Sequence, residues 1–233
     1  MYRLKTKDME VINMFNSKYS KFLTVILVIV IIGIIALLGF LGYDYYNKYF
    51  TENDNRKFVD DFENQISTSE ENNTTTEGNA VNPLDSIEST PTASTGKRPQ
   101  YKGFDTSGTI YIPKTNAKYA VITKMSKKAI ETAVAIQYGG PELNQPGNTV
   151  IAGHNYRNGL FFSNNKKLDI GDVIYITDNS GTKLKYTIYN KYETSEHDTD
   201  YMTRDTQGAK EISLTTCTDN SKARLIIWAK ADE

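Results

Sequence analysis

The stretch Glu211-Ile-Ser-Leu-Thr-Thr-Cys217, with Ala223-Arg-Leu-Ile-Ile-Trp-Ala229 after a short polar turn, decides how this chain folds. Both segments are rich in β-branched and apolar residues, which favour strands. Alternate side chains of a strand point to opposite faces. Ile212 and Leu214 are the apolar pair and should face a core. Cys217 then lies on the opposite face, at the end of its strand, which disfavours an inert core cysteine.

The two strands are predicted to pair as a hairpin. This pairing would place Cys217 opposite Arg224 and Thr215 opposite Ile226, and cross-strand partners share one face of a sheet. A guanidinium beside a cysteine favours its thiolate and can hold a developing oxyanion. The alternative is that Arg224 is a solvated strand arginine.

A histidine is the expected acid/base partner of the cysteine, and the chain has two. His154 follows the apolar run Asn148–Ala152 and Gly153, where a buried strand enters a polar loop, and functional side chains are often found at such exits. His197 lies in a polar, acidic stretch and is the weaker candidate. Arg157 is a weaker rival to Arg224.

The rest of the region from residue 101 to residue 233 is mainly β. Short runs separated by turn residues predict a small barrel or sandwich, and the runs are Gly108–Ile112, Lys118–Thr123, Asn148–Ala152, Asp172–Thr177, Leu184–Tyr192, Glu211–Cys217 and Ala223–Ala229. One helix is predicted from its capping residue Ser126 through Ala133 and Val134, ending before Gly139. A second short helix is expected around residues 161–168.

The N-terminal part of the chain has a different composition. Phe22 to Tyr43 contains no charged residue and is long enough to span a bilayer as a helix. The alternative is a cleaved signal peptide, but the run is longer than a signal core, and bulky tyrosines follow it where a small-residue cleavage site should lie. We therefore expect a retained transmembrane helix.

The charges around this helix predict its orientation. Before it lie five basic residues and two acidic ones, whereas the residues after it are balanced to acidic. The positive-inside rule then leaves residues 1–21 in the cytoplasm and exports everything after residue 43. Residues 44 to about 66 suit a short juxtamembrane helix. Residues 67–100, rich in Ser, Thr, Asn, Glu and Pro, are expected to form a disordered stalk.

Charge and cysteine content narrow the function. The net charge of −1 gives no reason to expect nucleic acid. Cys217 is the only cysteine, so no intramolecular disulfide is possible. In an exported protein a lone cysteine is an intermolecular link, a buried inert residue or a reactive thiol.

These residues together resemble a known family. Ser213-Leu-Thr-Thr-Cys217 is similar to the TLxTC signature of sortases, with Ser213 where Thr is usual. Arg224 follows on the next strand, as the sortase arginine does, and Ala152-Gly-His154-Asn resembles the sortase histidine segment. The order His, Cys, Arg also agrees, and the resemblance covers about residues 104 to 232.

The resemblance implies a closed sortase-type β-barrel, residues 101–233, preceded by a transmembrane helix (22–43) and a juxtamembrane segment with a stalk (44–100). It implies a cysteine transpeptidase in the cell membrane of a Gram-positive bacterium, with Cys217 as nucleophile, His154 as acid/base and Arg224 at the oxyanion. Thr216 or Thr215 would assist at the oxyanion or the substrate.

The expected substrates are surface proteins with a C-terminal LPxTG-like sorting signal, cleaved between Thr and Gly. The acceptor would be an amine of a cell-wall precursor or of peptidoglycan. The short segment between Tyr192 and the Cys217 strand departs from class B sortases, and no Asp-Pro-aromatic lid motif of class C is seen. Class A and class D stay open.

No cofactor is expected, and one cysteine with two distant histidines does not suit a zinc site. Some class A sortases bind calcium beside the active site, so the resemblance leaves calcium modulation as the remaining metal hypothesis. Acidic residues between Tyr192 and the Cys217 strand could offer the oxygen ligands that Ca²⁺ prefers. The candidate ligands are Glu193, Glu196, Asp198 and Asp200.

Two rival functions are considered. Papain-like cell-wall endopeptidases also use Cys and His, but they place Cys first in the chain, and here the order is reversed. A catalytically silent, membrane-tethered β-domain that binds wall polymer or a protein partner would leave Cys217 unreactive and dispensable.

Overall fold

The computed structural model describes residues 18–71 and 98–232. The chain divides into two compact units, with the boundary between Tyr49 and Phe50. The first 17 residues, which carry three of the five basic residues in the predicted cytoplasmic flank, lie outside the described residues. So do residues 72–97, which make up most of the predicted stalk.

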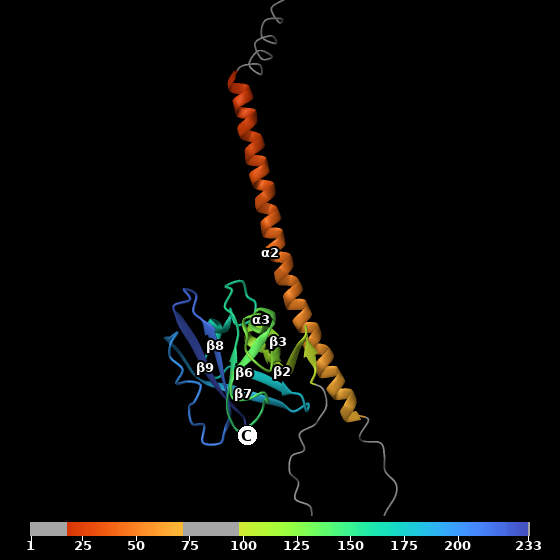
Figure 1. The fold of residues 1–233 in the computed structure, drawn as a ribbon, viewed down its shortest axis with the longest axis vertical. Coiled ribbons are helices and arrows are strands. Elements are labelled where there is room, and N and C mark those ends of the chain that lie inside the picture. Colours follow the sequence, from red (N-terminus) through yellow and green to blue (C-terminus); the bar gives the residue numbers. More distant parts are fainter. Residues whose placement is uncertain (1–17, 72–97, 233) are drawn as a thin grey trace, which may run out of the picture. The chain divides into compact units, whose positions relative to one another are not determined.

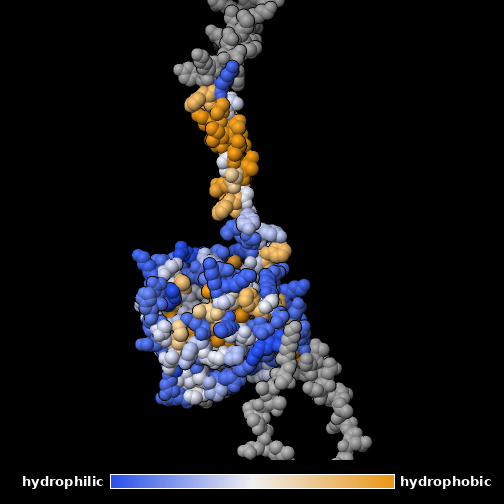
Figure 2. Space-filling view, viewed as in Figure 1, coloured by the Kyte–Doolittle hydropathy of each residue, from blue (hydrophilic) through white to orange (hydrophobic). Residues whose placement is uncertain are grey.

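The first unit contains the N-terminal part of a long helix, α2 (Lys18–Glu71). Among the described residues, this is the one helix long and apolar enough to cross a membrane. Its apolar side chains between Phe22 and Tyr43 are exposed, for example 66% for Phe22 and 69% for Phe40, and they form the orange stretch in Figure 2. A bare apolar surface of this length is what a lipid bilayer would cover.

From Phe50 onward, α2 belongs to the second unit and packs on the β domain. Asn55, Val59 and Phe62 are buried, and the Phe58 ring lies 5.0 Å from that of Tyr101. Ion pairs join this part of α2 to the domain at three places, namely Asp54–Lys102, Asp60–Lys118 and Glu63–Lys183. The expected juxtamembrane helix is therefore also part of the folded domain, and α2 continues to Glu71, past the expected start of the stalk at Ser67.

The domain is a β-barrel (Figure 1). The sheet order is β1-β2-β3-β4-β5-β8-β9-β7-β6, and pairing of β2 with β6 closes strands β2 to β9 into a barrel. The pairs β3–β4 and β5–β8 are parallel. The strands are β1 (Gln100–Tyr101), β2 (Phe104–Ile112), β3 (Ala117–Ile122), β4 (Val134–Tyr138), β5 (Gly147–Ala152), β6 (Val173–Asp178), β7 (Lys183–Ser195), β8 (Lys210–Cys217) and β9 (Ala223–Ala231).

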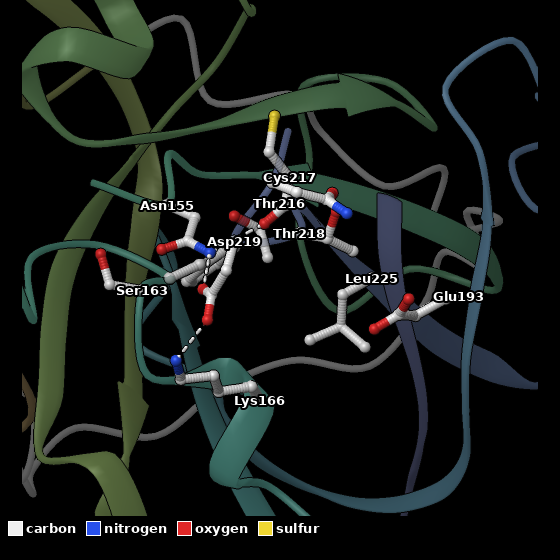
Figure 3. Close-up of a pocket in the computed structure, with 11 residues that line it drawn as sticks. Asn155, Ser163, Lys166, Glu193, Thr216, Cys217, Thr218, Asp219 and Leu225 are labelled. Carbon is white, nitrogen blue, oxygen red and sulfur yellow. Dashed lines mark hydrogen bonds and ion pairs between the residues drawn. The ribbon is translucent and has the colours of Figure 1, made fainter. Parts of the chain in front are cut away.

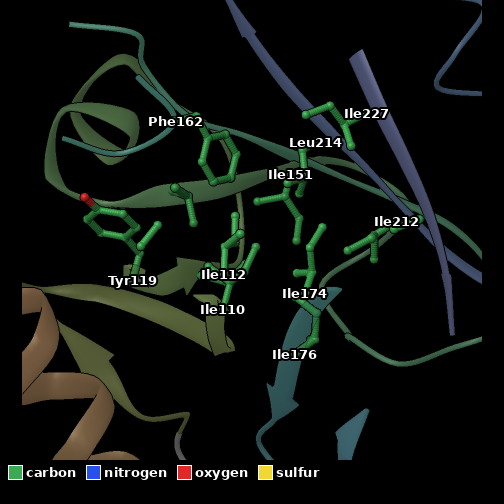
Figure 4. Close-up of a cluster of buried hydrophobic side chains, with 14 of the residues drawn as sticks. Ile110, Ile112, Tyr119, Ile151, Phe162, Ile174, Ile176, Ile212, Leu214 and Ile227 are labelled. Atoms are coloured by element: carbon green, nitrogen blue, oxygen red, sulfur yellow. The ribbon is translucent and has the colours of Figure 1, made fainter. Parts of the chain in front are cut away.

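The barrel interior is filled by aliphatic and aromatic side chains (Figure 4). Ile212 and Leu214 of β8 lie in this core, as the alternation predicted, and both are about 1% exposed. They meet Ile110, Ile151 and Ile227 from other strands. The predicted closed barrel, mainly β with little helix, is confirmed.

The helical predictions need correction. Ser126 does cap α3 (Lys127–Thr132), accepting a hydrogen bond from Ala129 N at 3.1 Å, but the helix ends at Thr132. After Ala133, the residues Val134-Ala-Ile-Gln-Tyr138 form β4 instead, because their β-branched and aromatic side chains fit a pleated surface between two strands. The helix expected at residues 161–168 is only a 3₁₀ turn, η2 (Asn165–Lys167), and a second such turn, η1, spans Pro113–Thr115.

Candidate active site

The β8–β9 hairpin brings the cysteine and an arginine together. Cys217 is the last residue of β8 and pairs with Arg224, while Thr215 pairs with Ile226, so the predicted register is confirmed. The turn is closed by a hydrogen bond of 3.0 Å from Thr218 N to Ala223 O. Because paired residues share a face, Cys217 and Arg224 extend from the same side of the sheet.

His154 reaches the same place from the neighbouring strand. β5 runs parallel to β8, with Ala152 paired to Thr215. Just beyond this pair, Gly153 N donates to Thr215 O at 3.1 Å, and Asn155 Nδ2 donates to Cys217 O at 3.0 Å. These two bonds lie on either side of His154 in the chain. They fix the histidine loop to the strand that carries the cysteine.

Gly153 is required by close packing. A Cβ atom at this position would lie 2.7 Å from the Phe162 ring and 3.0 Å from a Val134 methyl group. Real Cβ atoms essentially never approach other heavy atoms as closely as the ring distance. A larger residue would therefore force the Phe162 side chain or the backbone next to His154 to shift.

The three side chains line one cavity of about 300 Å³. Its other walls are mainly apolar and come from α3 and the turn before it, from β4, β5 and β8, and from the loop between β7 and β8. The lining residues are Met125, Ile130, Gln137, Ala152, Gly153, His154, Tyr201, Thr215, Thr216, Cys217 and Arg224.

Burial decides the resting charge of the histidine. Removal from water lowers the pKa of His154 below its usual 6.5, and the negative charge of Glu131 opposes this only in part. The ring stacks on Tyr156, with centroids 4.7 Å apart. Burial therefore favours the neutral imidazole of His154 over its charged form.

Arg224 has few protein partners. Its Nη1 donates to Ala223 O at 3.3 Å, and its Nη2 lies 3.7 Å from a Glu196 carboxylate oxygen. Within the described chain these are its only polar contacts. Most of its five donors are free to meet a ligand in the cavity.

Thr215 and Thr216 are both about 5% exposed, and both line the cavity. The Thr216 hydroxyl is buried, and within the described chain it has no hydrogen-bond partner. An unpaired buried hydroxyl is costly unless a partner arrives. In strand β8, Thr215 shares the face of Cys217, whereas the Thr216 side chain points to the opposite face.

The sortase domain family model matches residues 110–232. This chain belongs to the sortase family. It is accordingly a cysteine transpeptidase of the sortase type. A search among curated proteins found no match.

Solved structures agree with this assignment. A class D5 sortase transpeptidase of Clostridium perfringens shares 29% identity and a TM-score of 0.51, over 55% of this chain and 80% of that one. A sortase C1 of Streptococcus suis shares the fold at 21% identity and a TM-score of 0.50, over 55% of this chain and 73% of that one. A sortase C-1 of Actinomyces oris shares it at 22% identity and a TM-score of 0.50, over 55% of this chain and 75% of that one.

The rival residues lie elsewhere in this sortase. The His197 side chain is 89% exposed, 3.8 Å from Glu196, and does not line the cavity. Arg157 donates to Ser221 Oγ at 3.2 Å and also lies outside the cavity lining. The geometry therefore favours His154 and Arg224 over both.

A second cavity of about 260 Å³ lies on the other side of the Cys217 backbone. Its side chains include the Lys166–Asp219 ion pair of 2.6 Å, and Asn155 Nδ2 donates to Asp219 at 3.0 Å. Figure 3 shows the Cys217 sulfur directed away from this pair. The sulfur thus does not face this second cavity.

No group of three or more His, Cys, Asp or Glu residues that could hold a metal is found within residues 18–71 and 98–232. Of the four candidate calcium ligands, Asp198 already accepts bonds from the Thr194 hydroxyl and from Asp200 N. Calcium modulation of this sortase stays an untested prediction.

Sequence reasoning missed several residues of the site. Tyr201 lines the cavity but comes from a loop whose polar sequence resembles a solvated segment. Asn155, next to the predicted histidine, fixes the loop by its amide. The motif Gly-His-Asn contained this signal, since an amide beside a loop histidine is well placed to bond backbone groups.

Proposed function

We propose that this sortase cleaves a C-terminal LPxTG-like sorting signal between Thr and Gly and joins the released carboxyl group to a cell-wall amine. The single observation that carries the proposal is the convergence of Cys217, His154 and Arg224 on one cavity. The apolar wall formed by Met125 and Ile130 suits a peptide with apolar side chains.

The first half-reaction forms a thioester. His154, neutral at rest, takes the thiol proton of Cys217 as the sulfur attacks the carbonyl carbon of the threonine. The carbonyl oxygen becomes an oxyanion, and the free guanidinium donors of Arg224 stabilise it. The C–N bond to glycine then breaks, and the imidazolium of His154 delivers its proton to the leaving amine.

The second half-reaction transfers the acyl group. An acceptor amine attacks the thioester carbon, and neutral His154 removes one of its protons. The C–S bond breaks, the proton returns to the sulfur, and a new amide is released. Thr216 or Thr215 would support the oxyanion or the substrate threonine, and Thr215, on the same strand face as Cys217, is the better placed of the two.

The proposed localisation is the cell membrane, with a single span by α2. Lys18 and Lys21 begin the helix, and three further basic residues precede them in the sequence. The positive-inside rule supports a cytoplasmic N-terminus and an exported barrel. The partners would be the lipid bilayer, surface proteins with a sorting signal, and a wall precursor or peptidoglycan amine.

Between class A and class D, the comparisons favour class D. The identity of 29% is with an enzyme described as a class D5 sortase, whereas the class C structures, at 21–22%, share the fold alone. We infer a class D-like enzyme.

The test uses the full chain in detergent with a panel of fluorogenic LPxTG-type peptides, with and without an added amine such as triglycine. We expect cleavage at the Thr–Gly bond that requires Cys217 and His154, and an amine-linked product. The His197→Ala variant is the matched histidine control and should keep wild-type activity.

Two results would count against the proposal. No cleavage of any peptide, together with slow alkylation of Cys217, would favour the silent binding domain. Cleavage that survives His154→Ala but is lost in His197→Ala would overturn the assignment of the base.

A further inference from the structure

The loop between β7 and β8, residues 196–209, forms one wall of the cavity without any helix or strand of its own. Tyr201 is its contribution to the wall. This side chain is only 4% exposed and packs against Val150 of β5 and Ile226 of β9. Because the loop has no helix or strand of its own, other contacts must fix the position of this aromatic side chain.

Asn148 of β5 holds the loop backbone. Its Nδ2 donates to the carbonyl oxygens of Tyr201 at 2.9 Å and Met202 at 3.1 Å. Its Oδ1 accepts from Ser213 Oγ at 2.9 Å and from Arg204 Nη2 at 3.1 Å. Both donors and both acceptor positions of this amide are used, so its orientation is fixed.

Arg204 joins this amide to a buried charge pair. Its Nη1 donates to Glu211 and, at 2.9 Å, to Tyr189 OH, which in turn donates to Glu211 at 2.5 Å. The guanidinium lies 4.5 Å from the Trp228 ring. The side chains of Arg204 and Glu211 are only 12% and 9% exposed.

We call Asn148, Tyr189, Arg204, Glu211 and Trp228 the Arg204 cluster. Its members come from the loop and from strands β5, β7, β8 and β9. None of them lines the cavity of Cys217. A buried charge pair is seldom a gain in stability over apolar packing, but it fixes geometry, because each bond has one allowed direction.

We propose that Arg204 is a positioning residue that, through Asn148, holds Tyr201 in place as a specificity-determining wall for an apolar side chain of the sorting peptide. The inference rests on the proposed function and adds the residues that select the peptide. Apolar pockets discriminate between side chains of different size by roughly 10–200-fold. A wall that moves freely would lose this discrimination.

The decisive variant is Arg204→Lys in the full chain in detergent. Lysine keeps the charge beside Glu211, but it has one nitrogen and cannot also hold Asn148. Arg98→Lys, which makes the same change in an exposed pair with Glu142, is the control. Asn148→Asp keeps the shape but turns the two donors into acceptors that face carbonyl oxygens.

The assay measures kcat and KM for sorting peptides with alanine placed at each position in turn. We expect wild type and Arg98→Lys to discriminate at least tenfold at one apolar position. Arg204→Lys, Asn148→Asp and Tyr201→Ala should all reduce that ratio to within about threefold, through KM rather than kcat. If Arg204→Lys lowers thermal stability but keeps the wild-type ratio, the residue is only structural and the proposal is wrong.

A second readout separates this inference from the proposed function. Alkylation of Cys217 by a small iodoacetamide and by a bulky apolar maleimide needs no turnover. The ratio of the two rates should change at least threefold in Arg204→Lys and in Tyr201→Ala, and not in Arg98→Lys. If no peptide is cleaved but the ratio changes, the proposed function fails and the positioning role of Arg204 stands. If the ratio is unchanged, the positioning role fails.

Discussion

Arg204, in the loop between β7 and β8, and Arg224, on β9, are held in opposite ways. Arg204 has charged, hydroxyl, amide and aromatic partners, and its side chain is 12% exposed. Arg224 has one backbone carbonyl and one carboxylate at 3.7 Å, and its side chain is 28% exposed. Both terminal nitrogens of the Arg204 guanidinium donate to protein groups, whereas the Arg224 guanidinium keeps most of its donors free.

In the proposed mechanism, Arg224 stabilises the oxyanion and Arg204 positions a wall of the cavity, so the two arginines have different tasks. Donors that must meet a transition state cannot be occupied in the resting protein, because only bonds formed there accelerate the reaction. Donors that position a wall should be occupied at all times. Loss of Glu211, the acid partner of Arg204, should therefore lower stability, whereas loss of Glu196, the acid partner of Arg224, should change only activity.

The largest expected effect is that of Glu211→Ala on stability. The substitution leaves the Arg204 charge buried beside an empty site, and breaking such a pair costs about 3–5 kcal/mol. For a domain of this size we expect the melting temperature to fall by about 10 °C or more. Thermal unfolding of the full chain in detergent, followed by Trp228 fluorescence, measures it. Glu142→Ala, in the exposed pair with Arg98, should change little.

The next effect is that of Arg224→Ala on activity. Loss of an oxyanion donor typically lowers the rate about 10²–10³-fold, and we expect this in kcat/KM for the sorting peptide. Because Arg224 has so few partners, the stability should stay within about 0.5 kcal/mol of wild type. A large drop in melting temperature with retained activity would reverse the contrast between the two arginines.

Acid should affect the two regions differently. The pKa of His154 is lowered by burial, so below about pH 6.5 the unfolded chain takes up a proton that the folded protein resists. Stability, and the supply of neutral imidazole, should both fall as the pH drops through this range. In the Arg204 cluster, burial and the bond to Glu211 raise the pKa of Tyr189 to about 12. The stability that comes from this raised pKa is lost only as the pH rises above about 10.

The measurement is the melting temperature of wild type and His154→Gln from pH 5 to pH 8. As the pH falls, the melting temperature of the variant should decrease less than that of wild type. Equal slopes for the two proteins would show that His154 keeps an ordinary pKa. The site of His154 and the Arg204 cluster would then not differ in their response to acid.

The placement of Arg224 opposite Cys217 was predictable because it is local. Cys217 and Arg224 are seven residues apart, and one hairpin with a two-residue alternation fixes their face. His154 was found from the exit of an apolar strand into a polar loop. The parallel pairing of β5 with β8 that brings it to Cys217 joins residues 63 positions apart in the chain, and only the fold supplies it.

The Arg204 cluster was not predictable for the same reason. Arg204 follows Tyr-Met-Thr in a loop that reads as solvated, and its partners are spread from Asn148 to Trp228. The packing of α2 on the β domain was predictable from the sequence, because Asn55, Val59, Phe62 and Ile66 recur at helical spacing on one face. The predicted end of α3 was wrong because a short apolar run suits a helix or a buried strand equally well.

The smallest expected effect is that of Glu196→Gln, which removes the acid partner of Arg224. The two groups are 3.7 Å apart and the Glu196 side chain is 46% exposed, so the ion pair is screened by water and contributes little. We expect unchanged melting and a change in kcat/KM of about twofold or less, in the direction of faster cleavage at low salt, because the guanidinium loses a competitor for the oxyanion. The matched variant Asp200→Gln removes a nearby loop charge without touching Arg224 and should have no effect. If Glu196→Gln instead lowered activity tenfold, Arg224 would need its carboxylate as Arg204 needs Glu211, and the two arginines would be held for the same purpose.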